Sequence, residues 1–291
     1  MAKRSLRTAL EAGEFIAAPG LHDMTAALVA KDVGFDFVYA SGYWLTASCY
    51  GLPDAGIATY TQMLDRVSTL ARTVDSTLIA DADTGYGGLL NVHHTVRGYE
   101  AAGVAAIQIE DQEFPKKCGH TPYRRCISKE EMADKVRVAC EARLNPRETL
   151  IIARTDARQA EGLAGALARA EAYAEAGADI LFVEALESEA EMREACARFD
   201  KPMMANMADG GRTPIRPAAE LAEIGYQLAI FPALSSLAAA AAIEAALRNL
   251  KATGTSLSPD VPLFSFDRFN RLVGFEEVWA FERRWGPDRT R

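Results

Sequence analysis

Short apolar runs recur along most of the chain, and a helix-like stretch separates each run from the next. Most runs are apolar at consecutive positions, which is typical of strands that are buried on both faces of a parallel sheet. The runs are Phe15 to Pro19, Phe35 to Ala40, Thr77 to Ala82, Ala105 to Glu110, Thr149 to Thr155, Asp179 to Glu184, Pro202 to Met207 and Gln227 to Pro232. The pattern therefore predicts a parallel sheet with helices between its strands.

Glycines mark the points at which several helix-like stretches end. An apolar run starts a residue or two after each of Gly34, Gly103, Gly177 and Gly225, as it does where a helix turns into a strand. Successive strand–helix units without a long polar linker predict a (β/α)8 barrel, an α/β fold, over residues 1–250. An open doubly wound sheet is the alternative, but no Gly-x-Gly-x-x-Gly motif follows the first run.

The last part of the chain, residues 251–291, has a different composition. A link that contains proline and serine, 256–262, precedes a stretch rich in aromatic residues, 264–285. We expect this stretch to form a helical tail. Two interpretations stay open: the tail packs on its own barrel, or it is exchanged with a neighbouring subunit and covers that subunit.

Composition limits the classes of function. The net charge is −8 and the basic residues do not cluster, so we expect no nucleic-acid partner. No apolar run reaches membrane length, and the segment from Met1 to Glu14 lacks the apolar core of a signal peptide. Five cysteines without scaffold spacing indicate reduced thiols, and we expect a cytoplasmic protein with no membrane partner.

One cysteine stands in a segment with the composition of a catalytic loop. Cys118 lies in Lys116-Lys117-Cys118-Gly119-His120, which follows the fourth apolar run. Neighbouring positive charge favours the thiolate form of a cysteine, and prolines on both sides of the segment favour a loop. A zinc site that uses Cys118, His120 and Cys126 is the weaker interpretation, because the spacing fits no common zinc motif. The remaining cysteines, Cys49, Cys140 and Cys196, are expected to be small buried side chains.

Carboxylates gather where predicted strands end. Asp81 and Asp83 end the third run and point the same way, Glu110 ends the fourth, and Asp54 follows the second. Isolated acidic residues at strand ends are usually caps or ion-pair partners. Several converging carboxylates repel one another unless a cation lies among them, and hard oxygen ligands suit Mg²⁺.

Other polar residues end the later runs. Arg154 ends the fifth run, Glu184 the sixth and Asn206 the seventh. Arginine presents a planar fork that can hold a carboxylate, although an ion pair with Glu184 or Asp156 is equally compatible with its position. After the second run, a hydroxyl and backbone N–H groups at Ser41-Gly42 could also hold a carboxylate.

Six motifs at these strand ends occur in the order in which one enzyme family carries them. They are Ser41-Gly42-Tyr43, Asp81-Ala82-Asp83-Thr84-Gly85-Tyr86-Gly87, Ile109-Glu110-Asp111, Lys116-Lys117-Cys118-Gly119-His120, Ala153-Arg154-Thr155-Asp156 and Asn206-Met207. Over nearly its full length the chain resembles the isocitrate lyase/phosphoenolpyruvate mutase superfamily. The Lys-Lys-Cys-Gly-His motif is similar to that of the carbon–carbon lyase branch.

Within that branch the chain most resembles the group of petal death protein, 2,3-dimethylmalate lyase and methylisocitrate lyase. Tyr43, Asn206-Met207 and the segment from Gly210 to Pro214 carry this likeness. Asp209 stands where the group often has glutamate, which leaves the geometry of that loop and the choice of substrate open.

The resemblance implies a Mg²⁺-dependent lyase that cleaves a 2-hydroxy dicarboxylate, of the 2-alkylmalate or methylisocitrate type, into a 2-oxo acid and a smaller carboxylate, with Mn²⁺ as a substitute metal. The implied metal ligands are Asp54, Asp81, Asp83 and Glu110. The implied substrate-binding residues are Ser41, Gly42, Tyr43, Asp81, Gly119, Arg154, Asn206 and Thr213. The implied catalytic residues are Cys118 as general acid, Lys117 and His120 as stabilisers of developing charge, Arg154, and Glu184 as a candidate base.

The resemblance also implies a mobile gating loop, which we place at Glu113 to Cys126, and we expect a homotetramer. Three rival functions stay open on the same scaffold. They are an oxaloacetate hydrolase or decarboxylase, a phosphonate-processing enzyme, and a barrel that only binds a dicarboxylate.

Overall fold

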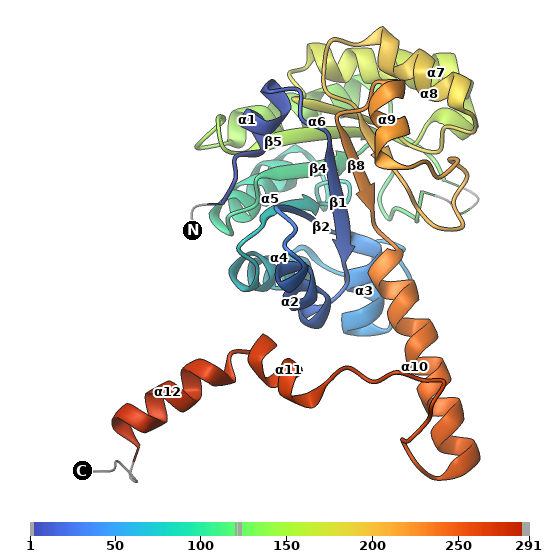
Figure 1. The fold of residues 1–291 in the computed structure, drawn as a ribbon. Coiled ribbons are helices and arrows are strands. Elements are labelled where there is room, and N and C mark those ends of the chain that lie inside the picture. Colours follow the sequence, from blue (N-terminus) through green and yellow to red (C-terminus); the bar gives the residue numbers. More distant parts are fainter. Residues whose placement is uncertain (1–2, 120, 122–123, 287–291) are drawn as a thin grey trace.

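The computed structural model describes residues 3–119, 121 and 124–286. Its strands form one parallel sheet in the order β6-β5-β4-β3-β2-β1-β8-β7, and a bridge between Leu181 and Met203 joins the two edges. The sheet is therefore closed, and the predicted (β/α)8 barrel is confirmed (Figure 1). The strands are β1 (Ile16–Leu21), β2 (Phe37–Ala40), β3 (Thr77–Asp81), β4 (Ala106–Glu110), β5 (Leu150–Thr155), β6 (Ile180–Val183), β7 (Met204–Asn206) and β8 (Leu228–Phe231).

Each predicted run overlaps one of these strands, with ends shifted by up to about two residues. The second strand starts at Phe37 rather than Phe35, because Gly34 ends the preceding helix in a left-handed conformation and Phe35 still lies in the turn. The other three glycines singled out in the sequence also have positive φ, as predicted: 87° at Gly103, 107° at Gly177 and 120° at Gly225.

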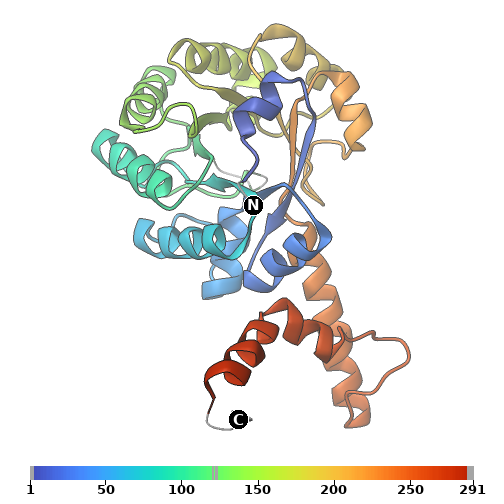
Figure 2. The ribbon, with the colours of Figure 1, turned by 60° about the vertical axis from the view of Figure 1, so that its left-hand side comes forward.

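Helices precede, separate and follow the strands, and most of them surround the barrel (Figure 2). They are α1 (Leu6–Glu11), α2 (Met24–Val33), α3 (Gly42–Tyr50), α4 (Tyr60–Thr73), α5 (Leu89–Ala101), α6 (Lys129–Ala142), α7 (Arg158–Glu175), α8 (Glu189–Arg198), α9 (Ala218–Ile224) and α10 (Leu234–Thr253). Capping boxes fix the starts of α4, at Thr59 and Gln62, and of α6, at Ser128 and Glu131. In the described part of the chain, no helix is long and apolar enough to cross a membrane.

Two apolar clusters support this architecture. The larger one fills the layer between strands and helices, and the smaller one fills the inside of the barrel. Leu6 and Ala9 of α1 belong to the inner cluster, so α1 closes the end of the barrel at which the strands begin. The opposite end, where the strands finish, is left for the site.

The tail leaves the barrel after β8. Helix α10 extends away from the barrel, and α11 (Phe266–Leu272) and α12 (Phe275–Trp285) follow it (Figure 1). No residue of these three helices is buried, although an ion pair of 2.5 Å joins Arg268 to Asp32 of α2. Large apolar side chains of the tail therefore remain exposed in the single chain.

Candidate active site

A cavity of about 250 Å³ opens at the carboxyl ends of the strands. Nine of the predicted site residues line it: Ser41, Tyr43, Asp54, Asp81, Cys118, Gly119, Arg154, Glu184 and Asn206. Gly42 and Asp83 line a smaller adjoining cavity that shares Asp54 with the first. Residues that are far apart in the sequence are thus brought to one place, as the strand-end positions predicted.

The end of β3 is shaped by close backbone contacts. Asp81 Oδ1 accepts a hydrogen bond of 2.9 Å from the backbone N–H of Asp83, and Asp81 Oδ2 accepts one of 3.3 Å from the N–H of Gly42. A Cβ atom at Gly42 would lie 2.8 Å from Asp81 Oδ2, so only glycine lets the start of α3 approach this carboxylate. Asp83 has a φ of 57°, an uncommon backbone conformation for a residue with a side chain.

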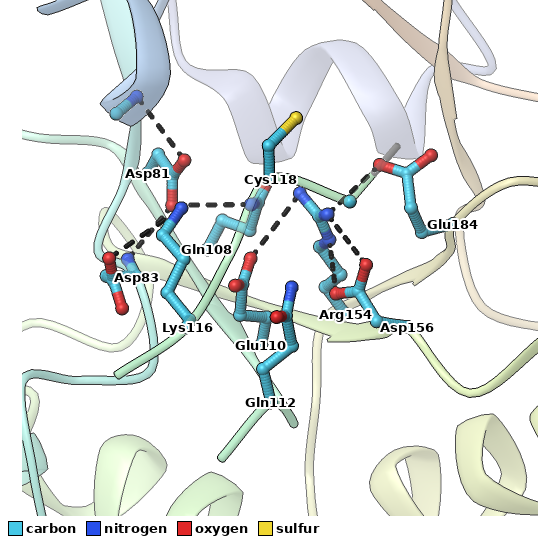
Figure 3. A network of polar contacts seen from close by, with 12 residues as sticks. Asp81, Asp83, Gln108, Glu110, Gln112, Lys116, Cys118, Arg154, Asp156 and Glu184 are labelled. Carbon is cyan, nitrogen blue, oxygen red and sulfur yellow. Dashed lines mark hydrogen bonds and ion pairs between the residues drawn. The ribbon is translucent and has the colours of Figure 1, made fainter. Parts of the chain in front are cut away.

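A buried lysine that sequence reasoning had not assigned to the site lies among the carboxylates. Lys116 Nζ is 2.7 Å from Asp54 Oδ1. It is also 3.7 Å from Asp83 Oδ2 (Figure 3). Burial disfavours the charged ammonium, but the surrounding carboxylates, Glu110 foremost, outweigh burial and raise the pKa of Lys116. Its position within the Lys-Lys-Cys motif was the available signal for a site role.

The four predicted metal ligands do not by themselves form a complete metal site. Among the residues that the structure describes, no three histidine, cysteine, aspartate or glutamate side chains are arranged so that they could hold a metal ion. Neither carboxylate oxygen of Glu110 receives a hydrogen bond from the residues that the structure describes, although the side chain is fully buried, and Arg154 Nη1 lies 3.4 Å away. Burial raises the pKa of Glu110, while Arg154 and Lys116 oppose that effect. An unsatisfied buried carboxylate beside other acids fits a site for a cation that retains part of its water shell.

Arg154 is fixed by ion pairs on several sides. Its Nε and Nη2 atoms each donate a hydrogen bond of 2.9 Å to Asp156, and Nη2 lies 3.3 Å from Glu184 Oε2. Burial disfavours its charge, but Asp156, Glu110 and Glu184 outweigh burial and raise the pKa of Arg154. Both roles that the sequence left open are therefore compatible, because the same guanidinium is ion-paired and lines the cavity.

Asn206, at the end of β7, is hydrogen-bonded to Glu184 in the lining of the cavity. Its Nδ2 donates a hydrogen bond of 2.9 Å to Glu184 Oε2, and its buried Oδ1 accepts none from the described part of the chain. That oxygen can accept a hydrogen bond from a ligand hydroxyl.

The loop that carries Cys118 lies directly on this group of residues. The backbone N–H of Cys118 donates to the carbonyl of Asp54 at 3.1 Å. A Cβ atom at Gly119 would lie 2.2 Å from Arg154 Nη2 and 3.0 Å from Asp156 Oδ1, so glycine is required for space rather than for backbone conformation. Figure 3 shows Cys118 with Lys116 on one side and Arg154 and Glu184 on the other.

Some predicted site residues lie elsewhere. Thr213 is buried and Lys117 belongs to the loop, but neither lines the cavity. His120 lies outside the described residues. The lining residues missed from the sequence include Trp44, Pro232 and Leu237, whose apolar side chains gave no chemical signal.

The other cysteines are half-buried rather than fully buried, because they lie on the outer helices or on the loop. Burial raises the pKa of Cys196 to about 12 and also raises the pKa values of Cys140 and Cys126.

Comparisons with known proteins agree with this architecture. The family model for phosphoenolpyruvate phosphomutase matches residues 6–251. The chain is 43% identical to a 2,3-dimethylmalate lyase of Eubacterium barkeri, over 98% of each chain. It is 45% identical to a 2-methylisocitrate lyase of Halalkalibacterium halodurans, over 91% of this chain and 87% of that one. A solved oxaloacetate acetylhydrolase in complex with 3,3-difluorooxalacetate superimposes with a TM-score of 0.92 at 31% identity, over 99% and 98% of the two chains. The resemblance inferred from the motifs is thus confirmed, and the chain is a lyase that belongs to the phosphoenolpyruvate mutase/isocitrate lyase superfamily.

Proposed function

We propose that this lyase cleaves a 2-hydroxy dicarboxylate of the 2-alkylmalate type into a 2-oxo acid and a smaller carboxylate. The observation that carries the proposal is the division of the cavity lining into polar and apolar parts. Asp81, Arg154 and Asn206 come from the ends of β3, β5 and β7, whereas Pro232 follows β8 and Leu237 lies in α10. Charged and apolar groups thus line different sectors of the barrel mouth, which suits a dicarboxylate that carries alkyl branches on its carbon chain.

The charges in the lining favour a dicarboxylate over methylisocitrate, which is a tricarboxylate. Lys116 and Arg154 are the cationic side chains among the described lining residues, and both already have carboxylate partners. A third substrate carboxylate would find no further cationic side chain among the described lining residues. An alkyl group can instead be buried against Trp44, Pro232 and Leu237.

We assign the oxo-acid half of the substrate to the polar sector. Arg154 would orient its carboxylate, because the guanidinium is held rigidly by Asp156 and cannot turn away. The hydroxyl of Ser41, at the start of α3, would donate to the same half, and the N–H of Gly42 would do so in exchange for its hydrogen bond of 3.3 Å to Asp81. Asn206 Oδ1 would accept the hydrogen bond of the substrate hydroxyl until that proton passes to the base.

Asp54, Asp81, Asp83 and Glu110 fit a Mg²⁺ site, with Mn²⁺ as a substitute, if part of the coordination is supplied by water. The unsatisfied oxygens of Glu110 support this assignment. When bound, the ion would lower the energy of negative charge that develops on the substrate's 2-oxygen.

The reaction needs a base and an acid from the protein. A base removes the proton of the 2-hydroxyl, the bond between C2 and C3 breaks, and its electron pair passes to an enolate-like form of the smaller carboxylate. Glu184 is the candidate base, because its carboxylate lines the cavity. The Cys118 thiol then gives its proton to the carbon that carries the new charge. Lys117 and His120 would stabilise that charge before the proton arrives.

An assay with four substrates tests the proposal: 2,3-dimethylmalate, methylisocitrate, oxaloacetate and phosphonopyruvate, each with Mg²⁺. We expect the highest kcat/KM with 2,3-dimethylmalate, and release of pyruvate as the 2-oxo acid. A kcat/KM with methylisocitrate that equals or exceeds it would contradict the argument from charge.

Oxaloacetate hydrolysis is the second candidate, supported by the fold similarity to oxaloacetate acetylhydrolase. Oxaloacetate has no alkyl group, so this reaction would leave the apolar sector unused. Release of oxalate from oxaloacetate at a higher kcat/KM than pyruvate from 2,3-dimethylmalate would favour this candidate. Phosphonopyruvate turnover in the same assay would favour a phosphonate-processing enzyme, and turnover of none of the four would favour a dicarboxylate-binding barrel.

We further propose that the tail packs against a neighbouring subunit in a homotetramer of a cytoplasmic enzyme. Phe275, Val278 and Trp279 lie on one face of α12 at helical spacing, and each is more than 40% exposed. Exposed apolar surface of this kind usually marks an interface. The absence of disulfides among the five cysteines agrees with a reducing compartment.

A further inference from the structure

The loop that carries Cys118 is joined to the barrel by an arginine that does not line the cavity. Arg124 has a side chain only 4% exposed, and its Nη1 lies 3.0 Å from Asp156 Oδ1. Nη1 also donates to the carbonyl of Gly119, and Nη2 donates to Gln159 Oε1 at 2.6 Å. A guanidinium loses much hydration when it is buried, so these acceptors decide whether the loop can stay in this position.

The carboxylate that receives Arg124 is the one that also orients Arg154. Asp156 Oδ1 accepts from Arg154 Nη2 at 2.9 Å and from Arg124 Nη1 at 3.0 Å. One buried carboxylate therefore joins the proposed anchor of the oxo-acid half to the loop. Displacement of either guanidinium changes the hydrogen bonding of the other.

The residues on both sides of Cys118 are also held by hydrogen bonds or close contacts, so the position of the loop determines the position of Cys118. The side-chain amide of Gln112 makes two hydrogen bonds to the backbone of Lys117. It accepts one from the Lys117 N–H at 3.0 Å and donates one to the Lys117 carbonyl at 2.8 Å. Gly119, on the other side of Cys118, lies in contact with Arg154 and is bonded to Arg124 through its carbonyl. Cys118 thus lies between Lys117 and Gly119, and both of these neighbours are held in place.

We propose that Arg124 and Asp156 are positioning residues that form a latch, which places Cys118 against the cavity and ties its position to that of Arg154. The latch acts through Gly119 and Arg154 and does not itself touch the substrate. The inference deepens the proposed lyase function and depends on that function only for its kinetic test.

The first test is hydrogen–deuterium exchange of the full chain without substrate, with Arg124→Met compared to Arg125→Met. Arg125 is the matched control, because it is the next residue, its side chain is 79% exposed and it pairs with Glu113 at 2.8 Å. Loss of hydrogen bonds to a charged group predicts that the Lys117 and Cys118 amides exchange about 10- to 100-fold faster in Arg124→Met. We expect Arg125→Met to exchange like the wild type. Equal exchange in the two variants would overturn the proposal.

The second test is kinetic. With 2,3-dimethylmalate, Arg124→Met should lose about 10- to 100-fold in kcat, because the acid is misplaced. Binding of pyruvate should weaken much less than kcat falls, because Asp156 still holds Arg154 with two hydrogen bonds. Arg124→Lys, which keeps the charge, should recover part of kcat. Faster exchange in Arg124→Met with an unchanged kcat would show a merely structural role and overturn the proposal.

A further variant covers the case in which Arg124→Met does not fold. Gln159→Ala removes the acceptor at 2.6 Å and leaves Arg154 and Asp156 untouched. Its Lys117 and Cys118 amides should exchange faster than in the wild type by about threefold or more, as loss of one such bond predicts. Unchanged exchange would overturn the latch. If the wild type cleaves none of the tested dicarboxylates, the proposed function fails, while the exchange experiment still decides the latch.

Discussion

The contact between Gly119 and Arg154 makes a single added methyl group a sharp test of the site. In Gly119→Ala the new Cβ atom would lie 2.2 Å from Arg154 Nη2, 3.0 Å from Asp156 Oδ1 and 3.1 Å from Glu184 Cγ. Ordinary contact begins near 3.4 Å, so the loop and Arg154 must separate by about 1.2 Å. Arg154 cannot yield easily, because Asp156 holds it with two hydrogen bonds. We therefore expect the loop to move, and Cys118 with it.

A displacement of about 1 Å in a catalytic group can reduce the rate about 100-fold. We expect Gly119→Ala to lose about that factor in kcat with 2,3-dimethylmalate, while its thermal midpoint stays close to that of the wild type. Gly88→Ala is the control, because a Cβ atom there meets nothing within 4 Å and the backbone φ is negative. Near wild-type kcat in Gly119→Ala would refute the claim that the loop lies against Arg154 during turnover.

Three further predictions follow from the site, the thiols and the tail. Exhaustive treatment with EDTA should abolish turnover, and added Mg²⁺ should restore it. Full activity after chelation would contradict the proposed Mg²⁺ site. Iodoacetamide at pH 8 should leave Cys196 and Cys140 largely unmodified in the folded protein, because burial raises the pKa of both thiols and so favours the unreactive protonated form; rapid modification, detected by mass spectrometry, would contradict this prediction. Trp279→Glu should shift the protein to smaller species in size-exclusion chromatography with light scattering, whereas Glu276→Gln should not; an unchanged mass for Trp279→Glu would exclude α12 from the interface.

The barrel could be predicted from the sequence because its determinants are local. Consecutive apolar residues recur at regular intervals, and glycines such as Gly103 and Gly177 stand where a positive φ is needed. The strand ends also placed Arg154 and Asn206 at one face of the molecule, since every strand of such a barrel ends on the same side.

The parts that escaped prediction depend on contacts between distant segments. No local pattern shows that Lys116 reaches Asp54, or that Arg124 and Arg154 share Asp156. The apolar sector was missed for a similar reason, because Leu237 in α10 reads as an ordinary helix residue until the helix is placed beside the barrel mouth.

The central claim, that Cys118 donates the proton after C–C cleavage, is tested most directly by Cys118→Ser. The measurement is kcat for pyruvate release from 2,3-dimethylmalate, together with the Kd of the same substrate determined by calorimetry. Loss of a general acid typically costs about 10²- to 10⁴-fold, so we predict a fall of that size in kcat with a nearly unchanged Kd. A variant that retains near wild-type kcat would contradict the account and favour a reaction that needs no cysteine.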